Sequence, residues 1–152
     1  MSNKLTKTGV SIHWIDDDEP RLVAAISQSC FGPDAWSEDK VCAFMERSDH
    51  IPKVLTVGSK AAGFNFYVLH DKVVFIRHFG VTPEFRRQGF GTQMVEALKI
   101  NLKQLRRRII AVEVPEDSLA GQVMFRECGF KWFRTTPSGY AMRYVAPRRR
   151  RP

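Results

Sequence analysis

The sequence lacks any long apolar run. Its hydrophobic stretches fall well short of the roughly 18 residues that a helix needs to cross a bilayer, so we expect no membrane span. Residues 1–7 also lack the apolar segment of a secretory signal peptide. We therefore expect a cytoplasmic protein.

Cysteine is scarce and has no metal-binding spacing. The three cysteines, Cys30, Cys42 and Cys128, are widely separated and odd in number. No two of them form a CxxC pair, and the four histidines do not cluster with them. This pattern disfavours a disulfide framework and a structural zinc site. We expect reduced, mostly buried thiols and no metal.

Acidic residues are the minority charge. The chain has 24 lysines and arginines against 16 aspartates and glutamates, a net charge of +8, and the four arginines at 148–151 account for half of that excess. A basic excess suits an anionic ligand or nucleic acid. However, aromatic residues do not alternate with the basic clusters at 103–108 and 148–151, as a platform for single-stranded RNA would require. We interpret these clusters as an exposed helix end and a disordered tail, which makes nucleic acid a disfavoured partner.

The composition is typical of one globular domain. The chain has 152 residues, of which 43% are hydrophobic and 26% are charged. No internal repeat or linker divides it. We expect a single domain over residues 8–146, followed by a disordered, arginine-rich tail over residues 147–152.

Hydrophobic periodicity predicts a mixed α/β chain. The acidic run at 16–19 precedes Pro20, which favours a helix start, and Gly32-Pro33 ends that helix. Ser37 is the expected cap of a second helix. A helical stripe runs from Met94 to Leu105. The predicted strands are 10–14, 53–57, 61–69, 73–81, 108–114, 130–135 and 140–145, and a further helix is predicted over 119–128.

The segment 81–92 lies between a predicted strand and a predicted helix. Gly89 and Gly91 allow the backbone to approach a ligand closely, and the helix start offers unpaired N–H groups. Arg86 and Arg87 add positive charge. This chemistry favours binding of a pyrophosphate, although an ordinary glycine-rich turn with exposed arginines is the alternative. The segment is neither a GxGxxG fingerprint nor a Walker loop.

The motif RxxGxG at 86–91, preceded by VTP at 81–83, resembles the acyl-CoA signature of the GNAT superfamily of N-acetyltransferases. The segment 113–130, which ends in Gly-Phe, resembles the fifth strand and fourth helix of that family. The segments 30–38 and 140–143 are most similar to the bacterial ribosomal-protein-alanine N-acetyltransferase branch. The resemblance implies an α/β (α+β) fold with a mixed, mostly antiparallel seven-stranded sheet. The sheet would be V-shaped at its fourth and fifth strands and flanked by about four helices.

The resemblance further implies that acetyl-CoA is the cosubstrate and lies between the fourth and fifth strands. Main-chain groups at 79–81 would then bind the pantetheine arm, and amides at 87–92 would bind the pyrophosphate. The implied cofactor-binding residues are Phe79, Gly80, Val81, Arg86, Arg87, Gln88, Gly89, Phe90, Gly91, Thr92, Ser118 and Phe125.

In this family a primary amine attacks the thioester directly, so a base must accept the amine's proton. Glu113 stands where the closest relatives place a carboxylate, and it could act through water. The alternative is an exposed strand residue or an ion pair with Arg106 or Arg107. His78 is a second candidate base, although a histidine satisfied by a neighbour is the preferred interpretation. Trp36 either lines the acceptor site or anchors the second helix.

Two departures from the family bear on function. Ser118 replaces the usual asparagine but can still hydrogen-bond and cap the following helix. Phe125 replaces the usual tyrosine and has no hydroxyl to protonate the leaving thiolate, so Tyr140, Tyr144 or solvent would have to serve. The alternative function is a catalytically impaired acyl-CoA-binding sensor or scaffold.

The loop at 136–139 lacks the tyrosine-bearing extension of the closest relatives. Peptide N-termini, which we favour, lysine side chains and small amines therefore all remain possible acceptors. We expect a monomer or a homodimer.

Overall fold

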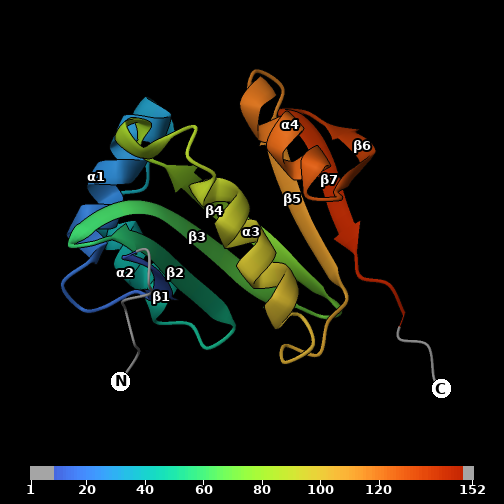
Figure 1. Cartoon of the computed structure of the whole chain (residues 1–152), viewed down its shortest axis with the longest axis horizontal. Coiled ribbons are helices and arrows are strands. Elements are labelled where there is room, and N and C mark those ends of the chain that lie inside the picture. The colour runs from blue at the N-terminus through green and yellow to red at the C-terminus, as the bar shows by residue number, and fades with distance from the viewer. Residues whose placement is uncertain (1–8, 149–152) are drawn as a thin grey trace.

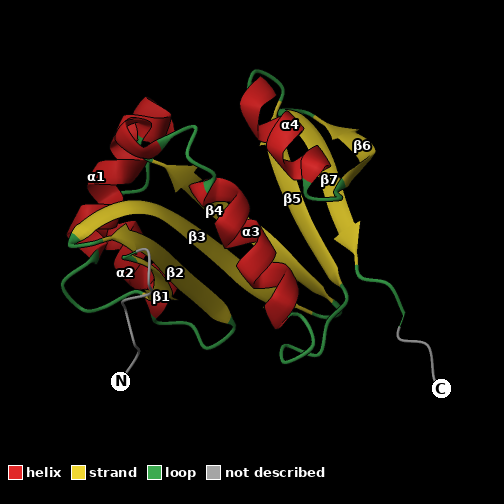
Figure 2. Cartoon of the chain, in the orientation of Figure 1, coloured by secondary structure: helices red, strands yellow, loops and turns green. Residues whose placement is uncertain are grey.

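The computed structural model describes residues 9–148 and contains one seven-stranded sheet with helices on both faces (Figures 1 and 2). Residues 149–152, most of the expected tail, lie outside the described residues. The strands are β1 (Val10–Trp14), β2 (His50–Val57), β3 (Lys60–His70), β4 (Val73–Val81), β5 (Ile109–Pro115), β6 (Lys131–Thr136) and β7 (Gly139–Val145). The helices are α1 (Pro20–Phe31), α2 (Glu38–Met45), α3 (Phe90–Asn101) and α4 (Leu119–Glu127), with short 3-10 turns at Gly32–Asp34 and Pro83–Phe85.

The sheet has the strand order β1-β2-β3-β4-β5-β7-β6. The β4–β5 pair is parallel, and the other five pairs are antiparallel. This topology confirms the expected mixed, mostly antiparallel sheet. Figure 1 shows β4 and β5 diverging toward the top of the view, so the sheet has two leaves, β1–β4 and β5–β7.

A bulge in β4 lies where the two leaves separate. β4 pairs with β5 only from Val73 to Ile76. On the other side, Ile76 and His78 pair with consecutive residues of β3, which leaves Arg77 as the extra residue. Ile76 packs in the core with α3 and α4, whereas His78 contacts Phe64 in the core beneath α1. Residues two apart in a regular strand point to the same face, so the bulge is the reason that Ile76 and His78 point to opposite faces of the sheet. A bulge also bends the strand that carries it.

Two helical layers bury the two faces of the sheet. We call these the α1/α2 face and the α3/α4 face. The core of the α1/α2 face consists of Val23, Ile26, Val41, Phe44, Val54, Phe64 and Phe66. The core of the α3/α4 face crosses both leaves and includes Val74, Ile76, Val95, Leu98, Val112, Val114 and Phe125. The two leaves therefore share one apolar core on the α3/α4 face.

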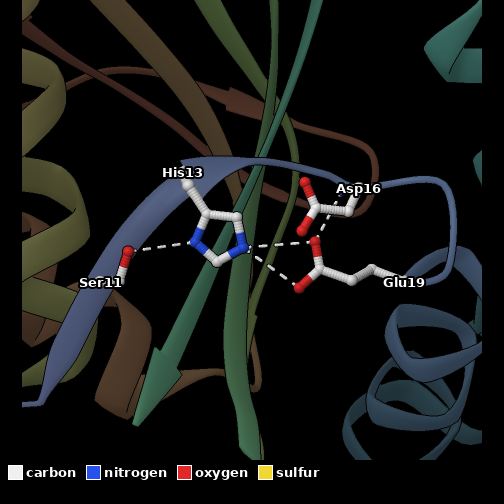
Figure 3. Close-up of polar contacts among 4 residues, drawn as sticks. All are labelled: Ser11, His13, Asp16 and Glu19. Carbon is white, nitrogen blue, oxygen red and sulfur yellow. Dashed lines mark hydrogen bonds and ion pairs between the residues drawn. The ribbon is translucent and has the colours of Figure 1, made fainter. Parts of the chain in front are cut away.

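The start of α1 is held by a buried polar cluster (Figure 3). We expected the acidic run to cap this helix, but Glu19 at the N-cap position makes no side-chain cap bond. Its carboxylate instead lies 3.1 Å from His13 Nε2 and accepts the Asp16 N–H at 2.7 Å. The hydroxyl of Ser11 lies 3.2 Å from His13 Nδ1. The cluster ties α1 to β1 through residues only six positions apart, a contact that the helix-start pattern did not reveal.

Most other local predictions agree with the structure, with a few differences. Ser37 caps α2 by accepting the Lys40 N–H at 3.2 Å. Helix α3 ends at Asn101, not near Leu105, and the turn after it contains Arg106 with φ 56°. Strand β2 begins at His50, three residues earlier than expected. None of the helices within residues 9–148 has the length and apolarity that a bilayer crossing requires.

All three cysteines are free thiols, and they differ in burial. Cys128 is buried in the α3/α4 core, and burial raises the pKa of its thiol, so it has the packing role expected of it. Cys30 and Cys42 are only partly buried. The expectation of mostly buried thiols therefore holds for one cysteine of the three.

Candidate active site

The loop before α3 is shaped to bind an anion. Gly89 is the N-cap residue of α3 with φ 80°, and Arg87 two residues earlier has φ 62°. Left-handed residues in such a turn aim successive backbone N–H groups into one concavity. Glycine has no side chain with which to cap the helix, so the first-turn N–H groups of α3 lack an acceptor from this position. These N–H groups are available to an anion, and the pyrophosphate site stays a prediction.

Side chains of the loop brace it. Arg86 donates from Nε to the carbonyl of Val81 at 3.0 Å, and Gln88 donates from Nε2 to the carbonyl of Glu84 at 3.4 Å. The ring of Phe90 meets that of Phe85 edge-on, with centroids 6.0 Å apart. Arg87 is exposed, as is Thr92 in the first turn of α3. These contacts fix the loop while leaving its outer surface open.

The two glycines have different tasks, contrary to the expectation that both allow close approach of a ligand. A Cβ at Gly89 would meet no atom within 4 Å. A Cβ at Gly91 would lie 2.8 Å from Met124 Sδ on α4. Gly91 therefore permits α3 to approach α4, and Gly89 is the position open to a ligand.

The end of β4 directs main-chain groups toward the gap between the leaves. The Thr82 N–H donates to the carbonyl of Ala62 in β3 at 2.9 Å. Because hydrogen bonding alternates along an antiparallel ladder, the groups of Gly80 also face β3, and those of Phe79 and Val81 face the β5 side. The Val81 carbonyl already accepts hydrogen bonds from Arg86 Nε at 3.0 Å and from Cys30 Sγ at 3.3 Å. The predicted contacts with a pantetheine arm therefore fall on the main chain of Phe79 and on the Val81 N–H.

Glu113 lies on β5, one residue beyond the last residue that pairs with β4. Its side chain is exposed, and Oε1 accepts a hydrogen bond from the Ser138 hydroxyl at 2.8 Å. The alternative expectation of an ion pair with Arg106 or Arg107 is wrong. Arg107 donates to the carbonyls of His70 and Leu105 instead. The hairpin between β6 and β7 thus orients the carboxylate.

Tyr140 and Glu113 lie on opposite faces of the second leaf. Tyr140 pairs with Val114, whose side chain belongs to the α3/α4 core. Glu113 pairs with Ala141 and points to the other face. Both residues lie at the end of the leaf where β5 has separated from β4. The structure therefore does not bring them into contact, but places them on the two faces of one leaf, beside the gap.

Phe125 is buried in α4, with 4% of its surface exposed. Its ring lies 5.5 Å from that of Phe79 on β4 and 5.1 Å from that of Phe130, centroid to centroid. It therefore packs across the gap between the leaves. Ser118 holds the N-cap position of α4 but makes no side-chain cap bond, so the expectation that it caps the helix is wrong.

His78 is satisfied by its neighbours, as the preferred interpretation had it. Its Nε2 lies 2.8 Å from the Ser27 hydroxyl, and its ring stacks on Trp36 with centroids 4.2 Å apart. Burial, with a smaller effect from the charge of Lys40, lowers the pKa of His78 to about 3. The imidazole is therefore neutral at pH 7 and is a poor proton acceptor.

A pocket of about 340 Å³ lies between α2 and the β4 bulge, a feature that the sequence analysis missed. It is lined by Trp36, Lys40, Ala43, Phe44, Arg47, His50, Val68 and Arg77. Trp36 lines this pocket and also packs against Phe44 with ring centroids 5.5 Å apart, so it anchors α2, and its place in an acceptor site stays a prediction. The lining comes from segments far apart in the chain, so no local signal could have revealed it.

The fold is shared by many solved acetyltransferase structures. The ribosomal-protein-S18-alanine N-acetyltransferase from Escherichia coli has a TM-score of 0.79 at 19% identity, over 91% of this chain and 96% of that chain. Ard1 from Thermoplasma volcanium has a TM-score of 0.82 at 17% identity, over 92% and 99%. The PaiA N-acetyltransferase from Thermoplasma acidophilum, solved in complex with coenzyme A, has a TM-score of 0.75 at 16% identity, over 90% and 98%. No curated protein matches the sequence significantly.

The sequence itself matches a family model. Residues 10–130 match the model described as "Acetyltransferase (GNAT) family". This range contains the loop before α3, the diverging strands β4 and β5, and helix α4, and it ends before β6 and β7. The chain therefore belongs to the GNAT family and is an N-acetyltransferase that uses acetyl-CoA as its cosubstrate.

Proposed function

We propose that the chain transfers the acetyl group to a primary amine by direct attack within a ternary complex. The observation that carries this proposal is the divergence of β4 from β5 beside the anion-binding start of α3. The pyrophosphate would rest on the amides of residues 87–92, and the pantetheine arm would bond the main chain of Phe79 and Val81. The thioester would then lie between the leaves, near the bulge in β4.

The chemistry follows from the faces on which the candidate groups lie. The neutral amine attacks the thioester carbonyl, a C–N bond forms and the C–S bond breaks. Glu113 accepts the amine's proton through water from the α1/α2 face. The departing thiolate takes a proton from Tyr140 or from water on the α3/α4 face. Ser138 holds the Glu113 carboxylate at 2.8 Å, so Ser138 would be a positioning residue.

The favoured acceptor is the N-terminus of a protein or peptide, in the cytoplasm. The similar structure from Escherichia coli is named for the alanine of a ribosomal protein, which supports this choice. A spermidine N-acetyltransferase from Vibrio cholerae, solved with CoA and spermine, has a TM-score of 0.73 at 14% identity, so small amines stay open, as do lysines. A second candidate function is an acyl-CoA sensor or scaffold, favoured by the missing hydroxyl at Phe125.

The test has two stages. Calorimetry with acetyl-CoA comes first, and no binding at millimolar ligand would overturn both candidate functions. Thiol release is then measured over peptides, lysine peptides and small amines. Binding without thiol release from any amine would favour the sensor. Among active-site variants, Glu113→Gln and Tyr140→Phe are compared with Glu127→Gln, an exposed control at the end of α4. Full activity in both Glu113→Gln and Tyr140→Phe would refute the proposed roles of Glu113 as base and of Tyr140 as acid.

A further inference from the structure

We propose that the acceptor amine carries an anionic group, a carboxylate or a phosphate, and that the pocket between α2 and the β4 bulge holds that group. The inference rests on the proposed function, because it assigns part of the acceptor site. Its physical basis is the charge of the pocket, which is independent of catalysis.

Cationic side chains from three segments converge on this pocket. Lys40 lies on α2, Arg47 just beyond that helix, and Arg77 at the bulge in β4. No carboxylate is among the described residues that line it. Asp49 lies outside the lining, and its Oδ1 is 3.8 Å from Arg47 Nε and 2.9 Å from Nδ1 of His50, which also lines the pocket. Asp49 therefore offsets part of the positive charge of Arg47.

The other two cations have no such counterion. Within residues 9–148, neither Lys40 nor Arg77 takes part in an ion pair. Lys40 Nζ instead lies 4.7 Å from the ring centre of Trp36, and Arg77 Cζ lies 5.7 Å from that of Phe75. Two cations beside aromatic walls, with no carboxylate between them, form a site that an anion complements.

The location links this charge to the chemistry. Arg77 directly follows Ile76, the last residue of β4 that pairs with β5, so the pocket lies at the closed end of the V. It opens on the α1/α2 face, the face to which Glu113 also points. An acceptor anchored here by its anion would extend its amine toward the gap and the Glu113 carboxylate. A volume of about 340 Å³ admits a side chain or a small head group.

The same charge acts against other acceptors. A polyamine or a lysine in a basic peptide would bring further positive charge to Lys40 and Arg77 and would be repelled. The expected substrates are therefore a peptide N-terminus followed closely by aspartate or glutamate, or a small amine that bears a phosphate. Both substrate classes carry an anionic group that the pocket could bind, and the experiment below distinguishes between them.

The first arm measures binding to the full chain saturated with CoA, by calorimetry. The ligands are O-phosphoethanolamine against ethanolamine, and an alanyl-aspartyl peptide against its alanyl-lysyl counterpart. We expect at least one anionic ligand to bind about tenfold more tightly than its partner, the size expected of one or two half-exposed ion pairs. The ligand pair that shows the preference identifies the source of the anion. No preference in either pair would overturn the inference.

Charge-reversal variants assign the preference to the pocket. Lys40→Glu and Arg77→Glu should each weaken binding of the anionic ligand by about tenfold and should not weaken binding of its cationic counterpart. Lys103→Glu, an equal charge change at an exposed position beyond α3, should have no effect. Melting temperatures confirm that the variants fold. Equal losses in Lys103→Glu would show a general charge effect and overturn the assignment.

The second arm measures thiol release from acetyl-CoA with the same ligands. If the anionic amines bind but no amine of any class releases thiol, the proposed function is overturned and the pocket remains an anion-binding site. Thiol release that favours neutral or cationic amines and is unchanged in Arg77→Glu would overturn the pocket assignment and leave the proposed function intact. With the expected result, Lys40→Glu raises KM for the anionic amine far more than it lowers kcat.

Discussion

The substitution Gly89→Asp should remove most of the affinity for CoA while the fold survives. Gly89 is exposed, and a Cβ there meets no atom within 4 Å. Its φ of 80° is unfavourable for most side chains, but aspartate and asparagine tolerate the left-handed region better than other residues do. The new carboxylate would stand at the start of α3, where the pyrophosphate is expected.

The magnitude follows from charge repulsion. A carboxylate roughly 5 Å from each of two phosphate charges, at an effective dielectric constant of about 40–80, raises the energy by about 0.8–1.7 kcal/mol per charge. The total of about 2–3 kcal/mol corresponds to a roughly 30- to 160-fold weaker complex. Added salt should reduce the difference, because the site is exposed.

Gly89→Asn is the matched control. It has nearly the same shape as Gly89→Asp and the same backbone strain, but no charge. Calorimetry with CoA and acetyl-CoA would compare both variants with the wild type, and urea unfolding would compare their stabilities. Affinity equal to that of the wild type in folded Gly89→Asp would refute the pyrophosphate site. Equal losses in both variants would show that shape, not charge, decides binding.

Four other residues give further testable expectations. Glu113→Gln should lower turnover at neutral pH by about 10²-fold or more if Glu113 is the base, and unchanged steady-state rates would contradict that role. Phe125→Tyr should raise turnover or leave it unchanged, and a clear fall in a stably folded variant would count against a hydroxyl being useful there. His13→Ala should lower the free energy of unfolding by about 3 kcal/mol, because it leaves the buried Glu19 carboxylate without its partner, and a urea titration showing a loss below about 1 kcal/mol would disagree. The pKa of His78 is lowered to about 3 in the fold, so the unfolded chain binds its proton first as the pH falls, and stability drops. Between pH 7.5 and 5.0 this loss should be about 2 kcal/mol, and His78→Gln should lack it; the same pH slope in both proteins would refute the assignment.

Local patterns predicted much of this fold because their causes are local. The bounds of β4 agree with the alternation of its side chains, and Ser37 caps α2 through a bond to a residue three positions away. The anion-binding loop was likewise visible in its glycines and arginines. Each of these features depends on neighbours within a few positions, which the sequence displays directly.

The features that could not be predicted depend on partners far apart in the chain. The bulge at Arg77 is defined by the pairing of β4 with β3, and the alternation of apolar and polar residues along β4 does not indicate it. Glu19 is a different case: its partner His13 is only six residues away, but no local pattern shows that this histidine is buried against the Glu19 carboxylate. The cationic pocket joins α2, β2 and β4, so its charge excess is invisible until the chain is folded.

The ladder between β4 and β5 is short, so the two leaves of the sheet are held together mainly by side-chain packing. Only four residue pairs join the leaves through their backbones, whereas one apolar core beneath α3 and α4 crosses the seam. Each leaf is also a continuous stretch of chain, connected by the turn after α3. Amide protons where β4 meets β5 are thus protected from exchange mainly by packing. A cosubstrate that contacts both leaves would stabilise their association, so without it these amides should exchange faster before those within either leaf do.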